Sequence, residues 1–561
     1  MLDKFDENGQ CSVSKSQIHT RRQLRLICIG AGIAGIAAAY KYDRQLSNVS
    51  FVIYEKNEDV GGTWLENRYP GCACDIPAHG YTYSWEGNPE WSCFYAEAPE
   101  IHAYYKSCAE KWNCMRYIKL SHQVTEAKWS SSSSKWDVSV KILATGETIV
   151  DECDVLLSAT GVLNKWKWPD ITGIHDFKGK LLHSARWDND YSFEGKRVAV
   201  IGAGSSAIQI VPKLTPIVAE MVSFIRSRTW ITAEFNADLA PQGRETRYSA
   251  EQIEKFKTDT QYFLDYRKRL YNASGANYTV YYKDSEKQKL AKQRFTQMMK
   301  ERLNFREDLC SRIIPEFAVG CRRFTPGTGY LEALVSPNSR VVTTDIECIT
   351  SGGLRTTDGE EYEVDAIICA TGFDTSFKPA FPVIGLNGRN LAEEWKEQPL
   401  HYLSVAAPGF PNYFMAGGPN SPISNGSLIA GLETAIDYAY RCITKMQTEN
   451  IVSLEPKIEA VEDFLEHRDA YMDLMVWSDS CKSWYKNGKS DGPVIGPWIG
   501  STWHYEEALR EPRFEDYQIH YLGRNRFAYL GDGRTIGEVE GVDMSAKITQ
   551  PGVSKLEKAL S

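Results

Sequence analysis

One pattern occurs twice in the chain and constrains its fold more than any other feature. It consists of an apolar run, a glycine-rich turn, a helical segment and a second apolar run. The first copy covers residues 25–29, 33–40 and 49–54, and the second covers residues 197–201, 206–214 and 221–225. A strand, a helix and a strand within about 30 residues form the unit of a parallel sheet. The duplication predicts an α/β fold with two doubly wound, Rossmann-like dinucleotide-binding domains.

The first glycine turn reads G-A-G-I-A-G at residues 30–35. In this motif the first glycine makes a tight turn, the second lets the backbone approach a pyrophosphate, and the third packs the helix on the strand. Glu55 ends the second strand, where a carboxylate accepts hydrogen bonds from both ribose hydroxyls. A ribose with free hydroxyls favours FAD, so we expect FAD to contact Gly30, Gly32, Ala34, Gly35 and Glu55.

The second glycine turn reads G-A-G-S-S-A at residues 202–207, and no acid ends its second strand. Arg226 and Arg228 stand there instead, and each could also be an ordinary surface arginine. A guanidinium pairs with a 2′-phosphate through two hydrogen bonds, whereas a carboxylate repels it. This turn therefore predicts NADPH. The expected contacts are Gly202, Gly204, Ser205, Ser206, Ala207 and Arg226.

The length, net charge and apolar segments of the chain limit the class of protein. A chain of 561 residues is too long for one hydrophobic core. Its net charge of -9 argues against nucleic-acid binding. No segment has the roughly 20 continuous apolar residues of a membrane span, and the first 22 residues lack the apolar region of a secretory signal. These features predict a cytoplasmic protein that is a monomer or weak dimer.

The 14 cysteines are scattered, and no two have C-x-x-C spacing. Cys72 and Cys74 form a C-x-C pair without a distant partner pair, which is weak support for a metal site or a redox dithiol. The pattern therefore predicts buried reduced thiols, not a disulfide framework, and no bound metal.

Other segments define the domain organisation. Residues 123–129 and 135–142 alternate as two strands joined by a serine run, which predicts a hairpin. Dense charges at helical spacing over residues 249–304 predict a helical insertion in the second dinucleotide-binding domain. An Ala-Thr-Gly segment follows each of the apolar runs 154–158 and 364–369, where the chain passes between domains.

We therefore expect an FAD-binding domain of residues 23–165 and 375–540, into which an NADPH-binding domain of residues 166–374 is inserted. The helical insertion covers residues from about 240 to 315. Residues 1–22 are expected to be a flexible lead-in, and residues 541–561 a weakly ordered tail.

Two longer motifs resemble those of a known family. Residues 61–75 resemble G-G-x-W-x(4)-Y-P-G-x(3)-D, and residues 177–188 resemble F-x-G-x-x-x-H-x-x-x-W-[P/D]. Both are signatures of Baeyer–Villiger monooxygenases. With the glycine turns and the Ala-Thr-Gly segments, the resemblance covers residues 25–540. It implies a fungal-type enzyme of secondary metabolism that uses FAD and NADPH. Through a C4a-peroxyflavin, such an enzyme inserts one oxygen atom from O2 next to a ketone carbonyl, giving an ester or lactone.

The resemblance also assigns catalytic residues. Residues 320–324, G-C-R-R-F, are similar to the family's G-x-[K/R]-R turn. By that match Arg323 is the catalytic arginine, and Arg322 reaches the 2′-phosphate of NADPH. A fixed cation lowers the barrier because negative charge develops on the peroxide and then on the former carbonyl oxygen. Asp75, beside the flavin, is expected to hold the Arg323 guanidinium in place.

Further roles come from the same matches. Thr63, Trp64, Leu65, Glu66, Tyr81 and Val124 are expected flavin contacts, Trp484 belongs to the nicotinamide and substrate pocket, and His183 and Trp187 form a conformational hinge. Phe324 stands where some relatives have Pro, and the G-G-P-N turn at residues 417–420 also departs from the family pattern. Both departures leave the shape of the substrate open.

Two other functions remain open at this point. Flavin enzymes that oxygenate nitrogen or sulfur carry a similar His motif, usually without the final Trp. A nucleotide-binding regulator without activity would also keep the two glycine turns, although it would not need all four motifs.

Overall fold

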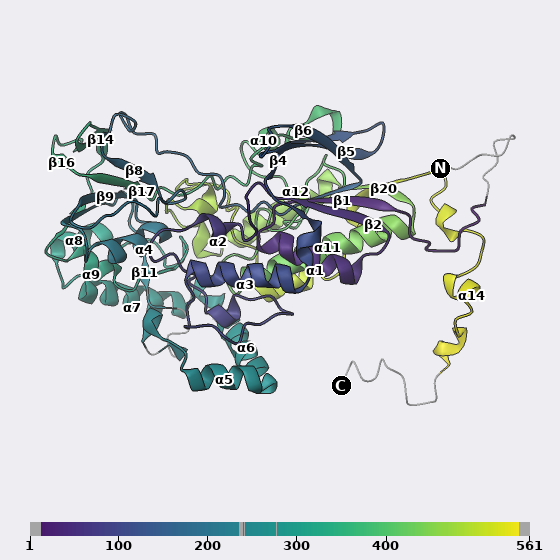
Figure 1. Cartoon of the computed structure of the whole chain (residues 1–561), viewed down its shortest axis with the longest axis horizontal. Helices are drawn as coiled ribbons and strands as arrows, with labels where there is room; N and C mark the ends of the chain where they lie inside the picture. Colours follow the sequence, from purple (N-terminus) through teal and green to yellow (C-terminus); the bar gives the residue numbers. More distant parts are fainter. Residues whose placement is uncertain (1–12, 235–238, 241, 277, 549–561) are drawn as a thin grey trace.

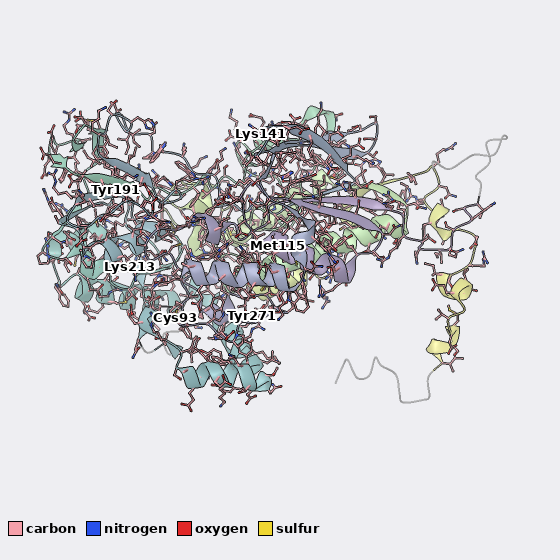
Figure 2. The ribbon with its side chains drawn as sticks, viewed as in Figure 1. Cys93, Met115, Lys141, Tyr191, Lys213 and Tyr271 are labelled. Carbon is pink, nitrogen blue, oxygen red and sulfur yellow. A yellow bond between two sulfur atoms is a disulfide. The ribbon has the colours of Figure 1, made fainter. Side chains whose placement is uncertain are left out.

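Two five-stranded parallel sheets form the two lobes of the molecule (Figure 1). The structure is a computed structural model and describes residues 13–234, 239–240, 242–276 and 278–548. The first sheet has the order β19 (Tyr413–Met415), β7 (Val155–Ser158), β1 (Leu24–Ile29), β2 (Val49–Tyr54), β3 (Ile118–Lys119). The second has the order β13 (Ser339–Val342), β10 (Glu220–Phe224), β9 (Arg197–Ile201), β17 (Ala366–Cys369), β8 (Lys180–His183). Figure 2 shows Lys141 in the first lobe and Tyr191 and Lys213 in the second.

Each predicted strand–helix–strand unit is present. Helix α1 (Ile33–Gln45) connects β1 to β2, and α4 (Ser205–Leu214) connects β9 to β10. In both lobes the first strand of the unit pairs in parallel on both of its sides, β1 with β2 and β7, and β9 with β10 and β17. These central strands are apolar along almost their whole length because both faces of a parallel sheet are covered.

Antiparallel sheets extend both lobes. The predicted hairpin is β4 (His122–Ser130) and β5 (Lys135–Ile142), and β6 (Thr148–Cys153) and β18 (Val383–Ile384) complete its sheet. The sequence did not indicate β6, whose residues alternate between exposed and half-buried and include two acids. Two smaller antiparallel sheets contain β14 (Ile346–Ile349), β15 (Gly353–Thr356) and β16 (Glu361–Glu363), and β20 (Ile451–Pro456) and β21 (Tyr517–Tyr521).

The predicted helical insertion lies between β11 (Ile231–Thr232) and β12 (Thr325–Pro326), which pair with each other. It contains α5 (Ala250–Thr258), α6 (Thr260–Gly275), α7 (Glu286–Arg302) and α8 (Glu307–Ile313). The side chains of Ser249, Asp259 and Ser285 cap the first three helices by accepting a backbone N–H from the first turn. Helices α5 and α6 project from the body at the bottom of Figure 1.

Most of the other helices cover the first lobe and its border with the second, whereas α9 packs on α4 in the second lobe and α14 lies apart from both sheets (Figure 1). The longest is α11 (Leu428–Thr448), which packs on α1. The others are α2 (Thr63–Glu66), α3 (Ala98–Lys111), α9 (Tyr330–Leu334), α10 (Leu391–Glu394), α12 (Ile458–Met472), α13 (Thr502–Ala508) and α14 (Ile536–Glu540). Within the described ranges, none of the helices combines the length and apolar character needed to cross a membrane.

The prediction that the cysteines are reduced thiols is wrong for one pair. A disulfide joins Cys321 to Cys481 across a sequence separation of 160. The other cysteines that the structure describes are free, and all but Cys348 are buried. The sequence carried no sign of the pair because its two members lie far apart and share no spacing pattern with other cysteines.

The segment around Ile18 contacts the C-terminal segment around Arg534 beside the first lobe. The backbone N–H of Ile18 donates to the carbonyl oxygen of Arg534 at 3.0 Å, and the rings of His19 and Tyr529 stack at 5.6 Å. Thus the described part of the predicted flexible lead-in is paired with the C-terminal region. Residues 1–12 of the lead-in and 549–561 of the predicted tail lie outside the described residues.

Candidate active site

A cavity of about 1220 Å³ extends from the first glycine turn to the helical insertion. Many of the residues predicted from the sequence line it together. They are Gly30, Gly32, Ala34, Glu55, Thr63, Trp64, Asp75, Tyr81, Val124, Ser205, Arg323 and Trp484. The fold thus gathers residues from the first lobe, the second lobe and the C-terminal region around one space.

The first glycine turn has the shape that a bound phosphate requires. Gly30 has a φ of +101°, and a Cβ there would lie 2.7 Å from the carbonyl oxygen of Ala159. A Cβ on Gly35 would lie 2.0 Å from the carbonyl oxygen of Gly30. Helix α1 begins after Gly32 without a side-chain cap, so its first N–H groups are open to an anion. Gly35 itself does not line the cavity, because it packs helix on strand.

The carboxylate of Glu55 is buried and oriented by the backbone. Its Oε2 accepts the N–H of Ala31 at 2.7 Å, and its Oε1 accepts the N–H of Asn57 at 2.8 Å. Burial raises the pKa of Glu55, and these two hydrogen bonds oppose that shift. Each oxygen keeps a second lone pair, so the carboxylate can still accept from a ribose in the cavity.

Asp75 and Arg323 form an ion pair in the cavity wall. Nη2 of Arg323 lies 2.7 Å from Oδ1 of Asp75, and Nε lies 3.1 Å from Oδ2. Nη1 donates to the carbonyl oxygen of Ile423 at 3.2 Å. The Asp75 charge raises the pKa of Arg323 above its already high usual value, although burial opposes it. The guanidinium is therefore a permanent positive charge held in one orientation.

Aromatic rings surround this charge. The ring of Tyr281 stacks on that of Phe324 at 5.3 Å, and the rings of Trp64 and Tyr81 meet edge to face at 5.7 Å. Tyr485 is buried in the same wall. Burial raises the pKa of Tyr485 to about 12, and the nearby Arg323 charge opposes that shift. Its phenol is therefore protonated at neutral pH.

Sequence reasoning missed several residues of this wall. Tyr281, Tyr485 and Gln209 all line the cavity. Gln209 lies on α4 of the second lobe, and its side chain donates to the carbonyl oxygen of Ala73 and accepts from the hydroxyl of Tyr69 in the first lobe. The sequence signal for Tyr485 was its position directly after Trp484, which was itself predicted to line the pocket.

The second glycine turn repeats the geometry of the first. Gly202 has a φ of +123°, and a Cβ there would lie 2.4 Å from the carbonyl oxygen of Ala370. Helix α4 begins after Gly204 without a side-chain cap. Of the residues predicted to bind NADPH, Ser205 lines the cavity, whereas the others lie outside it. These others are Gly202, Gly204, Ser206, Ala207, Arg226 and Arg322.

Three arginines stand beyond the end of β10. Nη1 of Arg322 donates to the carbonyl oxygen of Arg228 at 2.8 Å, and burial lowers the pKa of Arg322. Nη1 of Arg228 pairs with Glu316 at 3.0 Å. The side chain of Arg226 is exposed. Arg226 and Arg322 are therefore better placed than Arg228 to meet an added phosphate.

The remaining predicted residues lie outside the cavity. Leu65 is buried in α2, and Glu66 forms an ion pair with Lys56 at 2.7 Å. His183 is buried at the end of β8, where its ring stacks on Trp166 at 4.7 Å and burial lowers its pKa to about 4. Trp187 stacks on Phe193 at 5.3 Å.

Two glycine turns, each followed by a helix without a side-chain cap, and a fixed cation border one cavity, an arrangement that fits an enzyme using two dinucleotides. Residues 23–243 match the family model described as flavin-binding monooxygenase-like. The chain is 41% identical to the FAD-binding monooxygenase tazF of Aspergillus terreus, over 93% of each protein. It is 33% identical to a Baeyer–Villiger monooxygenase of Pseudomonas aeruginosa, over 87% of this chain and 90% of that protein.

A solved structure supports the same relationship. The fold matches an oxidized steroid monooxygenase bound to NADP with a TM-score of 0.73 and 27% identity, over 89% of this chain and 100% of that one. The chain belongs to the flavin-binding monooxygenases of the Baeyer–Villiger type. This result confirms the resemblance, the α/β fold class with two Rossmann-like domains, and the prediction of an enzyme.

Proposed function

We propose that this protein is an FAD- and NADPH-dependent monooxygenase that inserts one oxygen atom from O2 next to a ketone carbonyl, giving an ester or lactone. The observation that carries the proposal is the Asp75–Arg323 ion pair in the wall of the cavity between the two glycine turns. When bound, FAD accepts a hydride from NADPH and activates O2. The residues of the chain bind, orient and shield the reacting groups.

Arg323 has the central role in this proposal. Attack on a ketone places negative charge on the former carbonyl oxygen, and a fixed guanidinium stabilises that charge without reorganising. Asp75 keeps the guanidinium in one orientation through both Oδ atoms. The aromatic wall excludes water and so strengthens the interaction. We assign Arg323 as the catalytic residue and Asp75 as the residue that positions it.

The first glycine turn is the proposed FAD site. The open N–H groups of α1 would hold the pyrophosphate, and the oriented carboxylate of Glu55 would hold the ribose. Cavity residues near the ion pair would contact the isoalloxazine. They are Thr63, Trp64 and Tyr81. Val124 lines the cavity from β4, whose first residue His122 bonds to Glu55, and would contact FAD on the ribose side. Leu65 and Glu66 belong to α2 itself.

The second glycine turn is the proposed NADPH site. The N-terminus of α4, with Ser205 and Ser206, would hold the pyrophosphate, and Arg226 and Arg322 would hold the 2′-phosphate. Trp484 in the cavity wall would meet the nicotinamide and the substrate.

The domain boundaries are part of the same proposal. The strands of the first parallel sheet come from residues 24–158 and 413–415, and those of the second from residues 180–369. This division supports an FAD-binding domain of residues 23–165 and 375–540 and an NADPH-binding domain of residues 166–374. His183 and Trp187, which precede the second glycine turn, would act at the hinge between them.

We further propose a ketone substrate of fungal secondary metabolism, a cytoplasmic location, and a monomer or weak dimer. The 41% identity to a fungal relative supports the first of these.

Product analysis tests the reaction. The purified protein with FAD and NADPH is offered ketones of graded size, each matched with a sulfide and an amine of similar shape. We expect NADPH consumption with ketones and an ester or lactone by mass spectrometry. Sulfoxides or N-oxides as the sole products would assign the enzyme to nitrogen or sulfur oxygenation. NADPH loss unaffected by every substrate would contradict the proposal.

A further inference from the structure

The disulfide joins two segments that both reach the cavity. Cys321 directly precedes Arg322 and Arg323, and Cys481 lies shortly before Trp484 and Tyr485. Arg323, Trp484 and Tyr485 all line the cavity. The bond therefore connects the turn that carries the proposed catalytic cation to the aromatic segment opposite it.

Noncovalent contacts join the two segments beside the disulfide, and the Tyr485 hydroxyl also meets the Arg323 side chain. Oδ2 of Asp479 accepts the backbone N–H of Ala318 at 2.7 Å, and Sγ of Cys321 lies 3.3 Å from the carbonyl oxygen of Asp479. The amine of Lys486 turns back to the same carbonyl oxygen at 2.5 Å. These contacts depend on the path of the chain at residues 479–481, which the disulfide fixes.

The segment after Cys481 is mixed in exposure, because Ser483, Tyr485 and Lys486 are buried. Lys482 and residues 487–493 are at the surface, and Tyr485 is fixed through its carbonyl oxygen, which accepts the N–H groups of Ile495 and Gly496. The turn at residues 318–321 has a second support, because the side chain of Gln288 bonds to both the N–H and the carbonyl oxygen of Val319. Loss of the disulfide would therefore free residues 479–482, which lead into the Trp484–Tyr485 wall, whereas the turn keeps its bonds to Gln288.

We propose that the Cys321–Cys481 disulfide positions the Trp484–Tyr485 wall against Arg323, and that a dithiol of the thioredoxin class controls the enzyme by reducing it. This inference rests on the proposed function. In the reaction the S–S bond breaks and each cysteine gains a hydrogen. The dithiol supplies two electrons and two protons and becomes a disulfide itself. Disulfides among free thiols in reducing compartments are commonly regulatory.

The surroundings of the pair fit such a role. Both sulfur-bearing residues are buried, but Ser480 and Lys482, the neighbours of Cys481, are exposed. A dithiol would reach the bond through Cys481, which is 4% exposed against 0% for Cys321, once the exposed residues beside it move aside. No other cysteine pair within the described residues is bonded, so reduction would act at one place.

The first experiment counts thiols in the FAD-loaded protein. Denaturing alkylation and mass spectrometry should modify two fewer cysteines before treatment with dithiothreitol than after it, with Cys321 and Cys481 making the difference. Trypsin should cleave at Lys482 and Lys489 faster after reduction. Modification of every cysteine in the untreated protein would overturn the proposal.

The second experiment measures the reaction. Reduction should lower kcat for the ketone by up to about 100-fold, as for a small displacement of positioning groups, while the FAD bound at the first glycine turn is retained. Reoxidation should restore the rate. The C321S/C481S variant should resemble the reduced protein and ignore dithiothreitol, whereas C348S, which changes the half-exposed free thiol, should behave like the wild type.

The controls separate this inference from the proposed function. An untreated wild type that forms no ester refutes the proposed function whatever the thiol count. An active wild type whose rate is unchanged by complete reduction refutes only the role of the disulfide. If C321S/C481S fails to fold, the treated and reoxidised wild type still decides the question.

Discussion

Asp75 and Arg323 are 248 residues apart in the sequence, yet their side chains form a two-point ion pair, with Nη2–Oδ1 at 2.7 Å and Nε–Oδ2 at 3.1 Å. One partner follows the first glycine turn, and the other lies in the turn that returns from the helical insertion. The pair exists only when both lobes are folded and docked. It thereby links assembly of the cavity to the charge that the chemistry requires.

Arg323→Ala should still bind FAD and accept a hydride from NADPH but should form no detectable ester. Removal of a fixed donor at a developing oxyanion typically costs on the order of 100- to 1,000-fold in rate. Stopped-flow absorbance of the flavin and product analysis separate the two steps. Arg323→Lys is the matched control, since it keeps the charge but loses the two-point geometry. Normal ester formation by Arg323→Ala would refute the assignment.

Asp75→Asn should lower the rate of ester formation because the guanidinium loses the partner that orients it. If Asp75 acts through Arg323, the two changes are not additive. The Asp75→Asn/Arg323→Ala double variant should then be no slower than Arg323→Ala alone. Rates of the four proteins in this cycle provide the measurement. Additive losses would show that Asp75 has a separate role.

Arg226→Ala and Arg322→Ala should weaken NADPH binding while leaving NADH binding nearly unchanged. A charged hydrogen bond is worth about 1.5 to 3 kcal/mol, or roughly 10- to 100-fold in affinity. Titration of the two dinucleotides by calorimetry tests this. Arg228→Ala is the control, because Arg228 already pairs with Glu316 and should matter less. Equal losses for NADH and NADPH would place the 2′-phosphate elsewhere.

The stability of the protein should fall in acid because of His79. Four aromatic rings surround this buried side chain, those of Tyr248, Phe256, Phe263 and Tyr266. Burial lowers the pKa of His79 to about 3 from 6.5. As the pH falls below 6.5, the unfolded chain binds the proton first, so the free energy of unfolding decreases until the pH reaches the folded value.

His79→Phe should remove this contribution, because Phe fits an aromatic environment and does not titrate. The slope of unfolding free energy against pH should decrease by up to about 1.4 kcal/mol per pH unit between pH 6 and 4. Denaturant melts at several pH values measure it. Other buried histidines, such as His183 and His401, keep part of the slope in the variant. An unchanged slope would show that His79 is not the source.

The sequence predicted the parts of the fold that local patterns encode. Glycine turns between apolar runs specify strand–helix–strand units because only glycine allows the close approaches at Gly30, Gly35 and Gly202. Dense charges at helical spacing over residues 249–304 predicted the helical insertion. Strand β6 was missed because an exposed strand with acidic residues lacks the apolar alternation that marks a half-buried one.

The site was predictable where motifs extend over several residues. Asp75 and Arg323 each end such a motif, and the structure brings them together. Tyr281 and Gln209 lie on helical segments without a motif, so only the docking of the insertion and of α4 reveals them. The Cys321–Cys481 bond likewise depends on two distant segments meeting in space.

Labelled oxygen tests the central claim most directly. The wild type is incubated with FAD, NADPH and a ketone substrate under 18O2, and the product is analysed by mass spectrometry. If the enzyme inserts oxygen from O2, the product is an ester or lactone with one 18O atom at the inserted position, and one NADPH is consumed per product. An ester without the label, or label found only on a nitrogen or sulfur atom, would contradict it.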